Sequence, residues 1–373
     1  MITPEKYRLV QGAKPLVARY MARGFASSRR GRRVLIAHHP KRISYSQIYP
    51  FFHYAAELRA RYGVQFRAIP FNDLLTSGQG LLAQTDILLL QPWFTAAPEA
   101  VEAACAAAKA ANPAVEISYL DSYAHNDLRM ARHLPEDLRF YVKKSLFTEP
   151  RDYLKAYRGD TNLNEYYSDL AGLPAEPVEF HVPEAVLPKL RLCPNFFTAP
   201  HLIDTFAAPA PPPQEGRKLD VQSRLRADGS PWYNAMRRNA IDAIEAVEGV
   251  SISPPGKLSF DDFMAEMRAA KLCFSPFGYG ELCWRDIEAI QAGAVMIKQD
   301  MGHLNTQPEL YEPGVTYLPV KWDCSDLAEV IHMALSDEAL RTRIATTAYE
   351  RIARYLREAQ FVEDMGFLFE EAA

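Results

Sequence analysis

The sequence predicts two doubly wound, Rossmann-like α/β domains that face each other across a cleft. Strand and helix patterns alternate over the first 120 residues, a proline-rich segment follows at 208–218, and the alternation then begins again. Strands alternating with helices imply right-handed crossovers and a parallel sheet. A chain of 373 residues also exceeds the size at which a single core usually keeps growing.

The first half is predicted from short apolar runs, which favour buried strands, and from longer amphipathic or alanine-rich segments, which favour helices. The predicted strands are residues 34–37, 64–70, 86–91 and 115–120, and the predicted helices are 48–62 and 98–111. Residues 121–202 lack this alternation of strand and helix patterns, although 134–140 and 151–157 are predicted to be helical.

The proline-rich segment predicts an extended linker between the domains. After it we predict strands at 219–223, 250–253, 271–274 and 295–297, helices at 232–247, 260–270 and 286–291, and a helical end after residue 325. The expected division is an acceptor-side domain at 1–207 with a basic N-terminal arm, a linker at 208–217, a nucleotide-sugar domain at 218–345, and terminal helices at 346–373 that cross back to the first domain.

The charge balance argues against a dedicated nucleic-acid binder, because the net charge is −4 and the isoelectric point is about 6.2. We therefore expect no nucleic-acid partner. The exception is the arm, where residues 1–33 carry nine Lys or Arg and a single acid, Glu5. Such an arm is most often solvated. Its functional alternative is attraction to an anionic membrane surface, worth about 1 kcal/mol per basic residue.

The expected location is the cytoplasm, with peripheral attachment at the inner face of the membrane as a further expectation from the arm. No apolar stretch approaches the roughly 20 residues that span a bilayer, and the N-terminus lacks the apolar region of a signal peptide. Five cysteines form no CxxC pair, which favours a reducing compartment.

The segment SPFGYGELCWRDIEAIQAGAVMI, residues 275–297, predicts a strand end, a glycine-containing loop, a helix and the next strand. Gly278 and Gly280 allow a ligand to approach the backbone, and the helix start offers free amides and a positive dipole end to a phosphate. At about 100° per residue, one side of the helix is apolar and the other carries Glu281, Arg285 and Glu288. These charges form either a solvated face or a site for sugar hydroxyls and phosphate. Two glycines without a third do not indicate dinucleotide binding.

This segment, within residues 258–325, resembles the donor site of GT-B glycosyltransferases. Glu288, followed by Ala289, and Gly293 match the Glu-Ala pair and the glycine of that pattern. The resemblance implies that Glu288 binds the ribose of a nucleotide sugar. It also implies that the loop Gly278, Tyr279, Gly280 and Glu281 lies near the diphosphate and the donor sugar.

One position departs from the pattern. Many retaining members place a glutamate eight residues before the second one, where this chain has Gly280, with Glu281 seven before. The sequence is in this respect similar to exostosin-like and family-one-type bacterial glycosyltransferases, and both stereochemical outcomes stay open. The resemblance also implies a basic residue against the diphosphate after the strand at 219–223. Arg224 and Arg226 stand there, and the alternative is a pair of exposed loop arginines.

Candidates for an acceptor-side base follow the first and fourth predicted strands. They are His38, the adjacent His39, Asp121 and His125. A metal site is not expected, because adjacent histidines of an extended chain point apart and no Asp-x-Asp occurs. No cofactor is expected beyond the nucleoside diphosphate sugar, which is a co-substrate.

The expected function is transfer of a sugar from a nucleoside diphosphate sugar to a hydroxyl of a glycan, lipid-linked or protein acceptor, in bacterial surface glycan or glycolipid synthesis. Two alternatives stay open: a catalytically silent nucleotide-binding module of the same fold, and a sugar-nucleotide epimerase.

Overall fold

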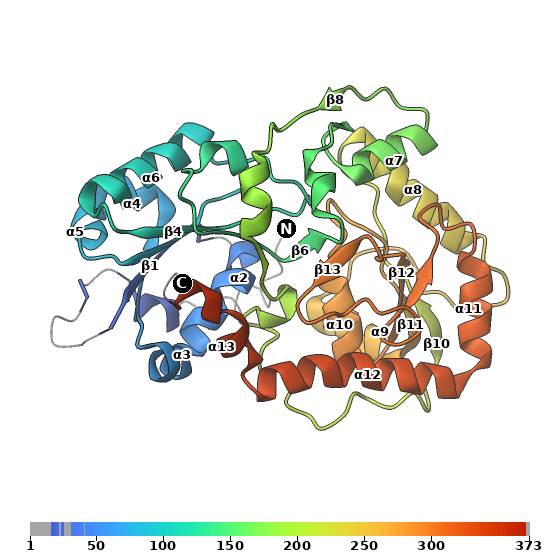
Figure 1. Cartoon of the computed structure of the whole chain (residues 1–373). Helices are drawn as coiled ribbons and strands as arrows, with labels where there is room; N and C mark the ends of the chain where they lie inside the picture. Colours follow the sequence, from blue (N-terminus) through green and yellow to red (C-terminus); the bar gives the residue numbers. More distant parts are fainter. Residues whose placement is uncertain (1–15, 22–23, 26–30, 41, 371–373) are drawn as a thin grey trace.

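The structure, a computed structural model, describes residues 16–21, 24–25, 31–40 and 42–370. Figure 1 shows two lobes side by side, each built on a parallel sheet. The prediction of two Rossmann-like domains is therefore confirmed as a fold class. The predicted domain boundaries stay a prediction.

The N-terminal lobe holds a six-stranded parallel sheet of order β2-β1-β3-β4-β5-β9. Its strands are β1 (Arg33–His38), β2 (Gln65–Pro70), β3 (Ile87–Gln91), β4 (Glu116–Leu120), β5 (Phe140–Lys143) and β9 (Leu190–Leu192). Helices α2 (Arg42–His53), α3 (Ala55–Tyr62), α4 (Leu74–Ser77), α5 (Gln79–Leu82) and α6 (Pro98–Ala111) accompany it. Helix α7 (Asn162–Leu170) instead packs on the C-terminal lobe, where the Tyr167 hydroxyl donates to the Trp322 carbonyl at 2.8 Å (Figure 1). The run of leucines in β3 is fully buried, as expected of a parallel strand covered on both faces.

The C-terminal lobe holds a four-stranded parallel sheet of order β10-β11-β12-β14. Its strands are β10 (Leu219–Gln222), β11 (Ala270–Phe274), β12 (Val295–Gln299) and β14 (Leu318–Val320). Its helices are α8 (Pro231–Glu245), α9 (Phe260–Ala269), α10 (Trp284–Ala292) and α11 (Leu327–Ser336).

Four predicted elements differ from the structure. The predicted helix 48–62 is two helices, because Tyr54 leaves helical geometry and donates its hydroxyl to the Leu356 carbonyl at 3.1 Å. The predicted helix 134–140 is wrong: Phe140 begins β5 and pairs with Ser118 of β4, so sheet pairing outweighs the local period. Residues 150–154 form a 3₁₀ helix, followed by the two-residue strand β7 (Tyr157–Arg158). The predicted strand 250–253 is reduced to a single bridge between Val221 and Ile252.

Several contacts join the lobes. The short strand β6 (Ser145–Phe147) follows the N-terminal sheet and pairs antiparallel with β13 (Leu304–Thr306) of the C-terminal lobe. Helix α12 (Glu338–Arg357) runs along the C-terminal lobe and leads to α13 (Gln360–Asp364) beside α2 and α3 (Figure 1). There the Phe361 ring packs edge-on against Phe51 at 4.9 Å. The end of the chain therefore packs on the N-terminal lobe.

The proline-rich segment is packed on the C-terminal lobe. Arg217 donates to the carbonyls of Ala270 and Ala292 at 2.6 and 2.8 Å. Gly293, which ends α10 with φ of 70°, has no room for a side chain because the Pro212 carbonyl lies against it. The segment thus fixes the end of the helix whose beginning forms the candidate site.

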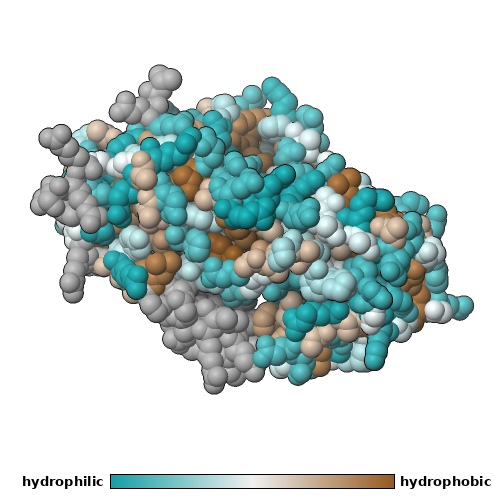
Figure 2. All heavy atoms as spheres, turned by 90° about the horizontal axis from the view of Figure 1, so that it is seen from below, coloured by the Kyte–Doolittle hydropathy of each residue, from teal (hydrophilic) through white to brown (hydrophobic). Residues whose placement is uncertain are grey.

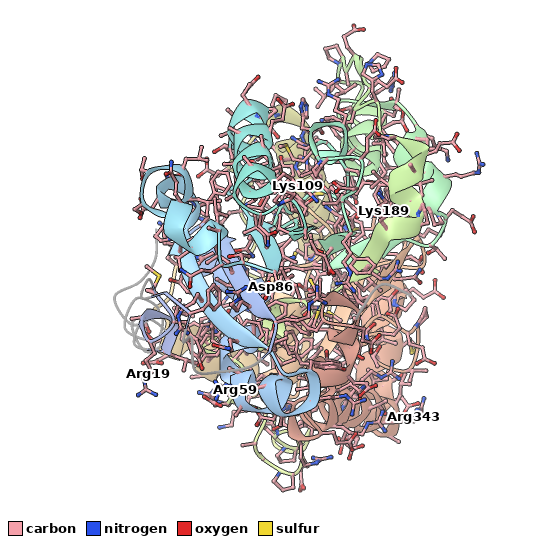
Figure 3. The ribbon with its side chains drawn as sticks, turned by 60° about the vertical axis from the view of Figure 1, so that its left-hand side comes forward. Arg19, Arg59, Asp86, Lys109, Lys189 and Arg343 are labelled. Atoms are coloured by element: carbon pink, nitrogen blue, oxygen red, sulfur yellow. The ribbon has the colours of Figure 1, made fainter. Side chains whose placement is uncertain are left out.

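The basic arm is described only in part. Arg32 and Arg33 pair with Glu116 and Asp86 at 2.5 and 3.2 Å, so both belong to the lobe rather than to a free arm. Arg19 is exposed and points away from the body in Figure 3. The other six basic residues of the arm lie outside the described residues.

The described surface gives two further facts about a membrane. None of the described helices is long and apolar enough to cross a bilayer. On the face drawn in Figure 2, hydrophilic residues cover most of the described surface, and hydrophobic residues form small scattered patches.

Candidate active site between the two lobes

The start of α10 is fixed by a buried carboxylate. Cys283 caps the helix, and its backbone amide donates to the Asp286 carboxylate at 3.0 Å. The same carboxylate lies 3.3 Å from Lys298 Nζ and accepts from the Tyr311 hydroxyl at 2.7 Å. Asp286 and Lys298 are both fully buried, so the helix start is held by charge pairing inside the lobe.

A cavity of about 350 Å³ lies at this helix start. It is lined by Arg224, Gly256, Lys257, Leu258, Ser259, Phe260, Phe263, Trp284, Arg285 and Glu288. Trp284 and Arg285 are the first two residues of α10, so the positive end of the helix dipole lies at the cavity. The structure thus brings together three of the predicted residues, Arg224, Arg285 and Glu288.

The two cavity arginines differ in their partners. Arg224 forms a bidentate pair with Glu266 at 2.7 and 2.6 Å, so its charge is largely compensated. Arg285 donates through one terminal nitrogen to the Arg224 carbonyl at 2.7 Å, while its buried Nε has no partner among the described residues. Arg285 is consequently the cation better placed to receive an anion.

Glu288 lies one helical turn after Arg285, and both side chains face the cavity. Its side chain is 4% exposed. Lys257 adds a third cation to the lining. Arg226 is exposed and is not part of this lining. Its backbone carbonyl accepts a hydrogen bond from Arg237 at 3.1 Å.

The glycine-containing loop faces the other lobe rather than this cavity. The Gly278 amide donates to the Gly280 carbonyl at 3.0 Å, which makes a tight turn. A Cβ at Gly280 would overlap the carbonyl oxygen of Ala124, in the loop after β4. Glycine is therefore required at this position by the close approach of the two lobes. Tyr279 between the glycines is 43% exposed, and its ring stacks on Tyr233 at 4.3 Å.

Glu281 is 1% exposed and ties the loop to two other segments. Its Oε1 accepts from Asn162 of α7 at 3.2 Å and lies 3.2 Å from His303 Nε2. Burial acts to raise the pKa of Glu281, but the hydrogen bond and charge of His303 outweigh it and lower that pKa. The Glu281 carboxylate is accordingly engaged in holding the lobes together.

In the N-terminal lobe, the Asp121 carboxylate already has three polar partners. The carboxylate lies 2.7 Å from Lys143 Nζ and accepts from the Tyr141 hydroxyl at 2.8 Å and from the Tyr123 amide at 2.9 Å. Asp121 and Lys143 are both buried. This carboxylate stabilises the sheet edge and is poorly placed to take a proton from an acceptor.

His38 is 1% exposed, and neither ring nitrogen has a hydrogen-bond partner among the described residues. Burial lowers the pKa of His38 to about 4, so the ring is neutral at neutral pH. His39 lies against Trp93, with 4.9 Å between the ring centres.

His125 has the geometry of an oriented base. Its Nδ1 lies 3.4 Å from Asp160 Oδ2, and its Nε2 is buried without a partner among the described residues. The ring stacks on Tyr123 at 4.5 Å and lies 6.3 Å from the Tyr279 ring of the other lobe. The same Nδ1 also lies 3.3 Å from a terminal nitrogen of Arg129, so the tautomer of the ring decides whether Nδ1 donates to Asp160 or accepts from Arg129. With the proton on Nδ1, the carboxylate holds that nitrogen and Nε2 is left to act on a substrate.

Asp160 is held in place by its own surroundings. It has a φ of 103°, which a residue with a side chain adopts only under constraint, and it lies 3.3 Å from both Arg129 and Asn164. Burial acts to raise the pKa of Asp160, but the hydrogen bond to His125 and the charges of His125 and Arg129 outweigh it and lower that pKa. Asp160 is therefore an anion at neutral pH.

No protein-family model and no curated protein sequence matches the chain. Among solved structures, it is similar to an alpha-glucosyltransferase in complex with UDP and a 13-mer DNA containing an HMU base, with a TM-score of 0.50 and 10% identity over 91% of this chain and 100% of that one. The chain has the GT-B fold.

Two further solved structures of GT-B enzymes are similar at lower scores. One is described as trehalose-6-phosphate from E. coli bound with UDP-2-fluoro glucose, with a TM-score of 0.46 and 9% identity over 91% of this chain and 99% of that one. The other is S. aureus TarM in complex with Fondaparinux, alpha-GlcNAc-glycerol and UDP, with a TM-score of 0.41 and 12% identity over 79% of this chain and 59% of that one.

The expected absence of a nucleic-acid partner conflicts with these comparisons, because the first GT-B neighbour is bound to DNA. A net charge averaged over the whole chain does not describe one face of the protein, and for this chain the absence of a nucleic-acid partner stays a prediction. For a metal, no group of three or more His, Cys, Asp or Glu in the described parts of the chain is arranged to hold an ion.

Sequence reasoning missed two residues of this GT-B cleft. Asp160 lies within residues 121–202, where the sequence shows no regular strand or helix pattern. Its only local signal is the Gly-Asp pair before Thr161. Thr161 caps α7 by accepting from the Asn164 amide at 3.1 Å. Asp286 was counted as an ordinary helix residue. Its position three residues after Cys283, where an acid closes a capping box, was the available signal.

Proposed function

We propose that the protein is a glycosyltransferase that moves a sugar from a nucleoside diphosphate sugar to a hydroxyl of an acceptor. One observation carries the proposal: the cavity at the start of α10 combines Arg285, Lys257 and Glu288 in the C-terminal lobe of a GT-B chain. Cations and helix amides suit a diphosphate, and a carboxylate suits the paired hydroxyls of a ribose. The UDP bound to the alpha-glucosyltransferase neighbour supports this reading.

In the proposed reaction, the bond between the anomeric carbon and the diphosphate oxygen breaks, and an acceptor oxygen bonds to that carbon. The leaving diphosphate gains negative charge, which Arg285, Lys257 and the α10 dipole stabilise. These groups are in place before the reaction, so little reorganisation is needed as the charge develops.

His125 acts on the acceptor side in this proposal. In an inverting transfer, its free Nε2 takes the proton of the attacking hydroxyl, while Asp160 holds Nδ1 and stabilises the resulting imidazolium. In a retaining transfer, the leaving diphosphate takes that proton, and His125 positions the hydroxyl. The anomeric configuration of the product distinguishes the two routes.

We place the activity at the cytoplasmic side of a bacterial membrane, in surface glycan or glycolipid synthesis. The support is the basic arm and the five free cysteines, of which four are buried. This setting is the finer part of the proposal and is tested separately below.

The test is turnover with a panel of UDP-, GDP-, ADP- and dTDP-sugars, each with and without a panel of glycan, lipid-linked and peptide acceptors. We expect nucleoside diphosphate to be released faster when an acceptor is present, with a new glycoside in the mass spectrum. Nucleotide binding without turnover would favour a silent module, and conversion of one sugar nucleotide to an isomer without acceptor would favour an epimerase.

A further inference from the structure

A row of aromatic rings crosses from one lobe to the other. Consecutive ring centres lie 4.3 to 6.3 Å apart, and the four contacts that lead from Phe94 to Tyr233 are stacked. The members of this aromatic row are His39, Trp93, Phe94, Tyr123, His125, Tyr279 and Tyr233.

Two members of the aromatic row are unusually exposed. Of the five large hydrophobic residues that stand out as exposed in the described chain, only Phe94 and Tyr279 are aromatic, at 39% and 43%. They lie on opposite lobes, on either side of His125 in the row. Aromatic rings exposed beside a base, rather than packed in the core, indicate a surface for a ligand.

Stacking alone does not identify the ligand, because both nucleobases and the C–H faces of sugar rings pack on aromatic side chains. Charge distinguishes them. Nucleic acid requires cations that are free to neutralise phosphates. Two arginines lie over rings of the row. Arg129, 4.2 Å from the Tyr123 ring centre, already pairs with Asp127 at 2.6 Å and with Asp160 at 3.3 Å. Arg237, 5.8 Å from the Tyr233 ring centre, is buried and donates to the carbonyls of Arg226, Pro276 and Phe277.

Uncharged polar groups lie behind the row. The Gln91 carbonyl oxygen accepts from the His39 amide at 2.9 Å, and the Gln91 side-chain Oε1 is buried without a partner among the described residues. The Ser122 hydroxyl and both nitrogens of His38 are likewise buried and unpartnered. Gln91, His38 and Ser122 are all buried, so the interior behind the row presents uncharged polar groups rather than cations.

We propose that the aromatic row is the acceptor subsite and that it binds a neutral oligosaccharide. This inference rests on the proposed function, since it assigns the acceptor of that reaction. Sugar rings pack on the exposed Phe94 and Tyr279, which places an acceptor hydroxyl beside His125, between them in the row.

The experiment measures binding by saturation-transfer NMR on the full chain. The probes are maltohexaose, cellohexaose, xylohexaose and chitotetraose, with a 13-base-pair DNA duplex as the competing class and UDP titrated into the same samples. The variants are Phe94→Ala and Tyr279→Ala. Leu75→Ala is the matched control, because Leu75 is 40% exposed but lies outside the row. Circular dichroism checks that each variant is folded.

We expect at least one oligosaccharide to bind, with saturation transfer lowered at least fivefold by Phe94→Ala and by Tyr279→Ala and unchanged by Leu75→Ala. The inference is overturned if no oligosaccharide binds, or if Phe94→Ala and Tyr279→Ala leave oligosaccharide binding unchanged. It is also overturned if these two substitutions weaken binding of the DNA duplex alone. If UDP still binds in any of these cases, the acceptor assignment fails but the proposed donor site does not. If UDP does not bind, the result contradicts the proposed function itself.

Discussion

The Nδ1 atom of His125 lies 3.4 Å from Oδ2 of Asp160, although 34 residues separate the two in the sequence. When the ring carries its proton on Nδ1, toward Asp160, Nε2 is the nitrogen that can act on an acceptor. Arg129, 3.3 Å from the same Nδ1, favours the other tautomer. The pairing of His125 with Asp160 joins the loop after β4 to the segment before α7, and it sits where the aromatic row crosses between the lobes.

Replacing His125 with Gln should lower turnover by about 10² to 10⁴-fold if the histidine takes the acceptor proton, because that is the usual contribution of a general base. Asp160→Asn should lower kcat by a smaller factor and alter the pH profile, since it removes the charge that stabilises the imidazolium. Nucleotide affinity, measured by calorimetry, should stay unchanged in both. A His125→Gln enzyme with wild-type kcat would exclude this role.

Glu288→Gln should weaken nucleotide binding by about 1 to 3 kcal/mol, the scale of a hydrogen bond to a charged group. The reason is that the Glu288 carboxylate is expected to accept from the ribose hydroxyls inside the cavity. Glu245→Gln is the control, because Glu245 is exposed on α8, outside this cavity. Equal nucleotide affinities of wild type and Glu288→Gln in calorimetry would contradict the assignment of Glu288 to the ribose.

His38 should make the protein less stable in acid. Burial lowers the pKa of His38 to about 4 from 6.5, so between these values the unfolded chain binds a proton that the folded chain does not. The free energy of unfolding should therefore fall as the pH drops from about 6.5 to about 4, by roughly 3 kcal/mol in total from this residue. At neutral pH this penalty is absent.

The check is urea unfolding of wild type and His38→Asn across that pH range. The variant should lose stability less steeply on acidification, whereas His181→Asn, at an exposed histidine, should follow the wild type. Parallel curves for His38→Asn and wild type would show that His38 does not carry the effect.

A chain with Gln in place of the seven basic residues before Gly31 tests the basic arm. It keeps Arg32 and Arg33, which pair with Glu116 and Asp86, and it keeps Val17 and Phe25, which are buried in the core of the N-terminal lobe. We expect less sedimentation with vesicles of phosphatidylglycerol and phosphatidylcholine, and a loss of wild-type binding as salt rises, because surface charge is screened within about 8 Å at physiological salt. Equal, salt-insensitive sedimentation of both chains would leave the arm as a solvated tail.

Sequence reasoning located the donor side of the cleft better than the acceptor side, for a physical reason. Arg285 and Glu288 stand on one helix, three residues apart, so helix geometry alone puts them on one face. Arg224 follows a strand whose neighbour leads into that helix, and parallel strands end at one edge of the sheet. The cavity lining contains all three.

The acceptor side depends on contacts between distant segments, which local patterns do not contain. The partners of Asp121 and of Glu281, at Lys143 and His303, follow from how loops pack after the sheets have formed. Asp160 meets His125 only because the segment before α7 folds over the loop after β4. These relationships therefore could not be predicted from periodicity.

The central claim is a diphosphate site at the start of α10, and calorimetry tests it most directly. The titration compares UDP, GDP, ADP and dTDP, each against its nucleoside, for wild type, Arg285→Ala and the control Arg226→Ala, whose arginine is exposed outside the cavity. The account predicts that one diphosphate binds at least 100-fold more tightly than its nucleoside, and that Arg285→Ala removes most of this difference while Arg226→Ala keeps it. Equal affinity of every diphosphate and its nucleoside for the wild type would contradict the account.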